Sequence, residues 1–313
     1  MPVDPCFAAL LADSRNELRR PPAHVPIAAM RQGNRAFLLA EPQAPLHSIE
    51  NLTAPGPAGP LQLRLYRPTN ERSLPLVLFM HGGGFVLGDL DTHDSICSAI
   101  AHHADSVVCA VDYRVAPEAR FPAPVDDGIA ALDWLLANAS TLGFDGSRVA
   151  LCGDSAGANI VTAVALRDRG EHTAALRALA LFYPTVDPAC GSESMNEFGR
   201  GHMLTRSGVE WFWSSYLGSA EDAANPEVCL LRADLRDLPR TTIVTAECDP
   251  LRDEGEALAA RLRDAGVEVT LHRWPGMLHG FVGMQQITPA AAIALRTVAA
   301  DLAAALAMAV EPS

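Results

Sequence analysis

Short apolar runs alternate with amphipathic stretches along most of this sequence. The apolar runs have the length and β-branched content of buried strands, and the amphipathic stretches repeat apolar residues at helical spacing. Continuous apolar strands separated by helices are typical of a mostly parallel sheet covered on both faces, so we predict an α/β fold. The predicted strands are 61–67, 74–80, 106–113, 148–154, 176–184, 241–247 and 267–273, and the predicted helices are 124–138, 156–169, 252–264 and 289–309.

Two segments depart from this alternation. Residues 1–55 are rich in Pro and Ala, and residues 188–225 contain the aromatic sequence WFWSSYL. Ligands of parallel sheets bind beyond the carboxyl ends of the strands. We expect the two segments to form a cap over those ends, so that residues 56–187 and 226–313 make the core.

The last predicted helix contains the apolar sequence AAIALRTVAADLAAALAMAV, which has the length of a membrane span. Arg296 and Asp301 interrupt this sequence. Its large apolar side chains repeat at helical spacing, as Leu295, Val298, Leu302 and Leu306. An amphipathic helix that closes the fold is the better interpretation, and we expect no stable membrane insertion.

Composition excludes several classes of function. The formal net charge is −13, and all 24 basic residues are arginines. A negative field repels phosphate backbones, so we expect no nucleic-acid partner. Without lysine, Schiff-base chemistry, the phosphate-binding loop ending in GK[ST] and the Ser-x-x-Lys hydrolases are excluded. The seven cysteines form no C-x-x-C pair and the N-terminal sequence is unlike a secretory signal, so we expect a soluble cytoplasmic protein.

The sequence CGDSAGAN, residues 152–159, joins a predicted strand to a predicted helix. Gly153, Ser155 and Gly157 make the G-x-S-x-G pattern of a nucleophile elbow, a strained turn that raises a serine hydroxyl above the sheet. A serine hydroxyl is a weak nucleophile at neutral pH. The interpretation therefore requires a base within hydrogen-bond reach and an acid that orients this base.

His279 is the predicted base, because the sequence GMLHGF places it in a loop just beyond the last predicted strand. From such a loop the ring can reach the elbow. His272 lies inside that strand, and His102 and His103 lie on a helix without metal-type spacing to other ligands. We expect structural or solvated roles for these three.

Asp249 is the predicted acid. It comes just past the strand ending at residue 247 and before a proline, which favours an open loop at the carboxyl edge of the sheet. Asp253 would lie in the following helix, where the helix dipole favours an acidic residue near the N-terminus. The resulting chain order of Ser155, Asp249 and His279 is the one expected for a nucleophile elbow of this kind.

Three consecutive glycines, residues 82–84, follow the predicted strand 74–80. Attack on an acyl group creates an oxyanion, which needs fixed N–H donors, and backbone approaches a substrate closely only where no Cβ intervenes. We predict that Gly83 and Gly84 supply two N–H groups and that Ala156 supplies a third. An ordinary glycine-rich turn is the alternative.

Six motifs together resemble the hormone-sensitive-lipase-like esterases, or bacterial family IV, in their GDSAG subgroup. The likeness runs from about residue 60 to 285, and its departures are Ala158 where glycine is common and Val115 where leucine is common. The motifs are HGGGF (81–85), DYRVAPE (112–118), FPAPVDD (121–127), GDSAGAN (153–159), DPLRDEG (249–255) and HGF (279–281).

The resemblance implies an α/β-hydrolase fold with a helical cap, and hydrolysis of small-molecule carboxylic esters with short to medium acyl chains. No metal or organic cofactor is required. It assigns the same nucleophile, base, acid and oxyanion donors, and gives His81 a loop-organising position. It also implies that Phe85, Leu204 and Phe212 line the acyl pocket, with Trp211 and Trp213 nearby.

Two other interpretations of the function stay open. A relative of this fold can bind a small molecule without catalysis, although such a protein would be expected to have lost the base. An amidase or an acyltransferase can use the same three residues. The sequence also leaves the oligomeric state open, a homodimer included.

Overall fold

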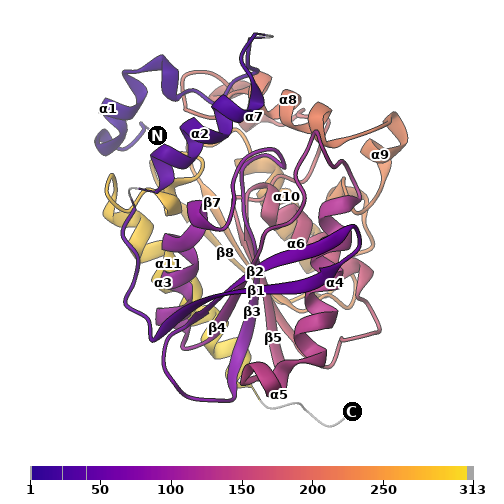
Figure 1. Cartoon of the computed structure of the whole chain (residues 1–313). Coiled ribbons are helices and arrows are strands. Elements are labelled where there is room, and N and C mark those ends of the chain that lie inside the picture. Colours follow the sequence, from indigo (N-terminus) through magenta and orange to yellow (C-terminus); the bar gives the residue numbers. More distant parts are fainter. Residues whose placement is uncertain (1, 23, 40, 309–313) are drawn as a thin grey trace.

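The computed structural model describes residues 2–22, 24–39 and 41–308 (Figure 1). A single eight-stranded sheet lies at its centre, in the order β1-β2-β4-β3-β5-β6-β7-β8. β2 runs antiparallel to β1 and β4, and all other neighbours are parallel, which confirms the predicted mostly parallel sheet. The strands are β1 (Ser48–Gly56), β2 (Gly59–Arg67), β3 (Leu74–Met80), β4 (Val107–Val111), β5 (Phe144–Asp154), β6 (Leu176–Phe182), β7 (Arg240–Ala246) and β8 (Val269–Trp274).

The central strands are buried on both faces, as their apolar sequences predict. Along β3, Leu76 and Leu78 belong to one hydrophobic cluster, whereas Val77 and Phe79 belong to the cluster on the other face. This is the two-residue alternation of a pleated strand. The first face is covered by α4 (Ala123–Ala137), α6 (Ala156–Arg167) and α10 (Arg252–Asp264), and the second by α3 (Asp94–Ala104) and α11 (Pro289–Ala307).

The predicted boundary at residue 55 is wrong by one strand. β1 (Ser48–Gly56) belongs to the sheet, where it pairs along its whole length with β2. Its side chains are mostly exposed or half-buried, and its sequence SIENLTAPG contains polar residues, Pro and Gly. An edge strand of this kind has no apolar run to reveal it.

Helices from both departing segments gather at the same end of the molecule (Figure 1). We call α1 (Ala8–Leu11), α2 (Ile27–Leu38), α7 (Glu193–Phe198), α8 (Arg206–Tyr216) and α9 (Ala220–Ala224) the cap. The two segments are joined through Leu18, whose N–H donates to Met203 O at 2.7 Å and whose carbonyl accepts from Thr205 N at 3.1 Å. The cap thus contains two pieces that are far apart in the sequence.

Within the described part of the chain, α11 is the helix whose length and composition would suit a membrane span. It packs against α3 and the sheet, and its side chains Leu295, Val298, Leu302 and Leu306 are buried there. Burial of this face is what a core helix requires. The prediction of an amphipathic closing helix is confirmed.

Candidate active site

Ser155 lies at the junction of β5 and α6, in a backbone conformation with φ 53° and ψ −115°. A positive φ is uncommon for a residue with a side chain and is typical of a strained functional turn. Glycine is required on both sides, because a Cβ on Gly157 would lie 2.0 Å from Met80 O and one on Gly153 would lie 2.5 Å from the Gly157 carbonyl carbon. The two glycines let the helix pack directly on the strand.

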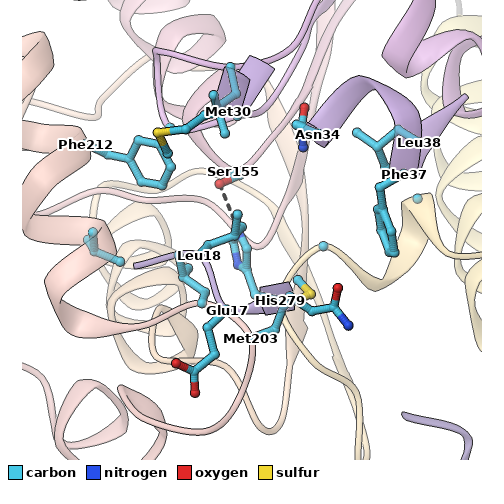
Figure 2. A pocket seen from close by; sticks show the side chains of 18 of the residues that line it. Glu17, Leu18, Met30, Asn34, Phe37, Leu38, Ser155, Met203, Phe212 and His279 are labelled. Atoms are coloured by element: carbon cyan, nitrogen blue, oxygen red, sulfur yellow. Dashed lines mark hydrogen bonds between the residues drawn. The ribbon is translucent and has the colours of Figure 1, made fainter. Parts of the chain in front are cut away.

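The structure brings Ser155, His279 and Asp249 together, and Figure 2 shows the contact between the first two. Ser155 Oγ lies 2.9 Å from His279 Nε2, and His279 Nδ1 lies 2.8 Å from Asp249 Oδ2. Because a carboxylate only accepts, Nδ1–H is the donor to Asp249, which leaves the Nε2 lone pair facing the serine hydroxyl. This tautomer is the one in which an imidazole can remove the serine proton.

Asp249 is fully buried just after β7, and its second oxygen, Oδ1, accepts from Leu251 N at 2.8 Å. Asp253, the other acid weighed from the sequence, lies in the first turn of α10. Its carboxylate accepts from Ser194 N at 2.7 Å and from Arg252 Nε at 2.8 Å. Of these two acids, Asp249 is the one that contacts the His279 ring.

The glycine loop after β3 has positive φ at two of its residues, 115° at Gly83 and 61° at Gly84. Both residues line the same pocket as Ser155 and His279. In the described part of the chain, nothing accepts a hydrogen bond from the N–H groups of Gly83, Gly84 or Ala156. Ala156 follows Ser155 directly as the first residue of α6, although it is not among the pocket-lining residues.

The start of this loop is held by its neighbours. The Tyr113 hydroxyl donates to His81 O at 2.7 Å, and His81 Nδ1 donates to Gly82 O at 2.8 Å. Burial, together with the nearby His93 ring, lowers the pKa of His81 to about 4, so the ring is neutral at neutral pH. His81 therefore lies where a loop-organising residue would.

A pocket of about 410 Å³ opens above Ser155 and is lined by both core and cap. Leu204 and Phe212 line it, and Phe212 covers the backbone of Gly84, where a Cβ would lie 2.3 Å from the Phe212 ring. Phe85 also lines the pocket, while its ring stacks on Tyr216 at 3.9 Å between centroids. Trp213 contributes to the lining as well, and Trp211 does not.

Sequence reasoning missed the contribution of α2. One face of this helix lines the pocket, and Figure 2 shows Met30 on the same side as Phe212, with Phe37 and Leu38 on the other side. The signal was present in the i, i+3, i+4, i+7, i+8 spacing of the lining residues. These residues are Met30, Gly33, Asn34, Phe37 and Leu38.

The remaining histidines singled out in the sequence lie away from this pocket. His272 Nε2 lies 3.0 Å from Asp301 Oδ2 on α11, and His102 and His103 are exposed on α3. Over residues 2–22, 24–39 and 41–308, no group of three or more His, Cys, Asp or Glu side chains could hold a metal ion.

A strained, buried serine whose hydroxyl faces an oriented imidazole, beneath free backbone N–H groups, defines a hydrolase with a serine nucleophile. Residues 77–283 match the family model described as alpha/beta hydrolase fold, and the chain belongs to this family. The predicted fold class is therefore confirmed.

Named relatives agree with this family. The chain is 40% identical over 269 residues to the carboxylic ester hydrolase LipN of Mycobacterium tuberculosis, covering 83% of this chain and 72% of that protein. It is 38% identical to an ethyl acetate hydrolase of Pseudomonas putida, covering 72% and 73% of the two chains. The solved structure of a hyperthermophilic esterase from Pyrobaculum calidifontis matches with a TM-score of 0.90 at 35% identity, over 98% of this chain and all of the other. The resemblance to family IV esterases is supported, and the GDSAG subgroup stays a prediction.

Proposed function

We propose that this chain is a serine carboxylesterase that hydrolyses small carboxylic esters with short to medium acyl chains. The observation that carries the proposal is the continuous hydrogen-bonded series from Ser155 Oγ through His279 to Asp249, at 2.9 and 2.8 Å. Such a series activates a hydroxyl that is otherwise unreactive. Relatives named as ester hydrolases support the same activity.

In the first step Ser155 Oγ attacks the ester carbonyl carbon while His279 Nε2 takes the hydroxyl proton. The C–O bond to the alcohol then breaks, and Nε2–H protonates the departing alkoxide. In the second step water attacks the acyl-serine, its proton passes to Nε2, and the acid leaves as Ser155 regains a proton. Asp249 holds the ring in the reactive tautomer and stabilises the imidazolium in each step.

Both steps place a negative charge on the carbonyl oxygen. The N–H groups of Gly83, Gly84 and Ala156 are the donors we assign to it, and the assignment is supported because none of the described residues accepts from them. Donors fixed before the reaction stabilise an oxyanion without reorganising, and the loss of one donor lowers the rate by about 10² to 10³.

Pocket size supports the substrate class. A cavity of about 410 Å³ lined largely by apolar side chains has the size of a small-molecule site and accepts a small ester. We assign Leu204 and Phe212 to the acyl-binding wall, and Phe85 to the support of that wall because its ring lies against Tyr216.

The test is a chain-length series of p-nitrophenyl esters with Ser155→Ala as the control. We expect a preference for acyl chains of about two to eight carbons, and a loss of kcat of about 10⁶-fold in the variant. A preference for long-chain emulsified triglycerides would overturn the pocket assignment. Full activity in Ser155→Ala would overturn the proposal itself.

The same experiment separates the alternatives. A binding protein without catalysis would bind the esters and leave them intact. Comparing an aryl ester with the matching aryl amide, with and without an added alcohol acceptor, distinguishes an esterase from an amidase or an acyltransferase. A homodimer and a cytoplasmic location stay predictions, the first tested by analytical ultracentrifugation.

A further inference from the structure

A buried carboxylate outside the Ser-His-Asp series lies next to the nucleophile. Asp154 immediately precedes Ser155, and only 6% of it is exposed. Its Oδ1 accepts from Gly82 N at 2.8 Å, across 72 residues of sequence. Its Oδ2 fills the space beside the Gly82 Cα, where a Cβ would lie only 2.3 Å away. The carboxylate therefore packs directly on the residue that precedes the proposed oxyanion donors.

His93 holds this carboxylate from the other side. Its Nε2 atom lies 3.4 Å from Asp154 Oδ1, and its Nδ1 atom lies 2.9 Å from Thr92 Oγ1. Thr92 is fixed in turn, because its Oγ1 accepts from Asp89 N at 2.9 Å. Burial alone raises the pKa of Asp154, but the nearby His93 ring and the Gly82 N–H outweigh it, and the pKa is lowered overall.

Residue 82 is thus held at both ends of its backbone. Asp154 accepts from its N–H, and His81 Nδ1–H donates to its carbonyl. The next two residues, Gly83 and Gly84, have positive φ and no Cβ. The turn is closed on its far side by Gly83 O, which accepts from Val86 N at 3.1 Å and Leu87 N at 2.8 Å, and Gly82 anchors its start. An oxyanion donor is effective only within about 2.7 to 3.1 Å of the developing charge, so any rotation at residue 82 weakens it.

Resting on the proposed function, we propose that Asp154 is a positioning residue, which holds the Gly82 N–H and thereby aims the Gly83 and Gly84 N–H groups at the reacting carbonyl oxygen. Its charge by itself would work against catalysis, because a buried anion near Ser155 opposes a second negative charge on the oxyanion. The hydrogen bond, rather than the charge, accounts for a carboxylate at this position.

Asp154→Asn and Asp154→Ala separate these two contributions. The asparagine keeps an oxygen that can accept from Gly82 N and removes the charge, whereas the alanine removes both. We expect Asp154→Ala to lower kcat about 100-fold with KM changed less than about threefold, and Asp154→Asn to stay within about fivefold of the unsubstituted enzyme. Asp154→Leu, which fills the space without an acceptor, gives the same comparison if the alanine variant does not fold.

Asp168→Ala is the matched control, because Asp168 is also a buried carboxylate paired with a histidine, His172, but lies at the far end of α6. We expect it to lower Tm without changing kcat.

A trifluoromethyl ketone, which forms an oxyanion when Ser155 adds to its carbonyl, supplies a direct readout of oxyanion binding. Its Ki should rise about as much in Asp154→Ala as kcat falls.

Three results would overturn the inference: unchanged kcat in Asp154→Ala, equal losses in Asp154→Asn and Asp154→Ala, or an unchanged Ki for the ketone. Failure of the proposed function would give a different result. The unsubstituted chain would then hydrolyse no ester, or would do so at a rate that Ser155→Ala leaves unchanged.

Discussion

The two walls of the pocket are built differently. On the core side, Ser155, His279 and Asp249 are buried, and each side chain is fixed by a hydrogen bond of 2.8 or 2.9 Å. On the cap side, α2 has no buried residue at all. Side chains of Arg31 and Arg35 hold this helix through hydrogen bonds to Val86 O and to acidic residues of the loop after β3.

The difference assigns separate tasks to the two walls. Chemistry tolerates only small displacements of the reacting groups, so it belongs on the rigid strand ends. Selection of a substrate by shape depends on side chains that can vary without disturbing the nucleophile. Substitutions on the core wall should therefore change kcat or stability strongly, and substitutions on the cap wall should change preference between substrates.

The largest expected effect is on the core wall, at Asp249. Asp249→Asn leaves the shape of the site intact but lets the amide donate to Nδ1, which stabilises the tautomer that cannot accept the serine proton. We expect kcat for p-nitrophenyl butyrate to fall about 10⁴-fold. Asp253→Asn is the control, because Asp253 lies four residues further along the chain and its carboxylate accepts from Ser194 N and Arg252 Nε instead of from His279. It should keep kcat within a few-fold.

The second expected effect concerns pH and stability. Glu254 is buried in α10, and desolvation raises the pKa of its carboxyl from 4.5 to about 8 despite the hydrogen bond from Val186 N. Above pH 4.5 the unfolded chain releases this proton while the folded chain keeps it. The stability that the protonated carboxyl contributes is therefore complete below pH 4.5 and is lost as the pH rises to about 8.

Glu254→Gln mimics the protonated carboxyl at every pH. Its free energy of unfolding should equal that of the unsubstituted chain near pH 4.5 and exceed it at pH 8 by on the order of 4 kcal/mol, measured by urea denaturation. Glu256→Gln controls for the loss of a carboxylate from the same helix. If the difference in free energy of unfolding between Glu254→Gln and the unsubstituted chain did not widen as the pH rises, the buried, protonated state of Glu254 would be contradicted.

The smallest expected effect is on the cap wall. Leu204→Phe adds volume to a buried residue that lines the pocket, and we expect it to lower kcat/KM for octanoate relative to acetate roughly tenfold. Leu217→Phe, in the same cap segment but outside the pocket lining, is the control. An equal loss for both esters would mean that this wall also supports the chemistry, which would remove the distinction between the walls.

Most of the sheet could be predicted because its central strands are apolar throughout and its helices begin and end near the predicted residues. The predicted helix 252–264 matches α10 residue for residue. β1 was missed because an exposed edge strand leaves no hydrophobic pattern. The catalytic motifs could also be predicted, since a nucleophile elbow and a glycine loop each need particular residues at particular spacings.

Contacts across long stretches of sequence could not be predicted in the same way. The carboxylate of Asp154, at the end of β5, accepts from Gly82 N in the loop after β3. His93 lies against the same carboxylate from a third segment. Nothing in the sequence near either residue indicates the partner, because only the folded sheet sets β3 and β5 side by side. The lining face of α2 had a helical pattern, but a pattern alone does not say that the helix covers a cavity instead of a core.

The backbone link at Leu18 has a practical consequence for protein engineering. Leu18 O accepts from both the backbone N–H and the hydroxyl of Thr205, and Gly208 leaves room for this approach because a Cβ there would lie 2.1 Å from Leu18 O. The two pieces of the cap are thus matched to each other. A chimaera that takes its substrate specificity from a relative should therefore carry both cap segments of that relative. Exchanging one segment alone would leave mismatched backbones where Leu18 meets Thr205 and Gly208.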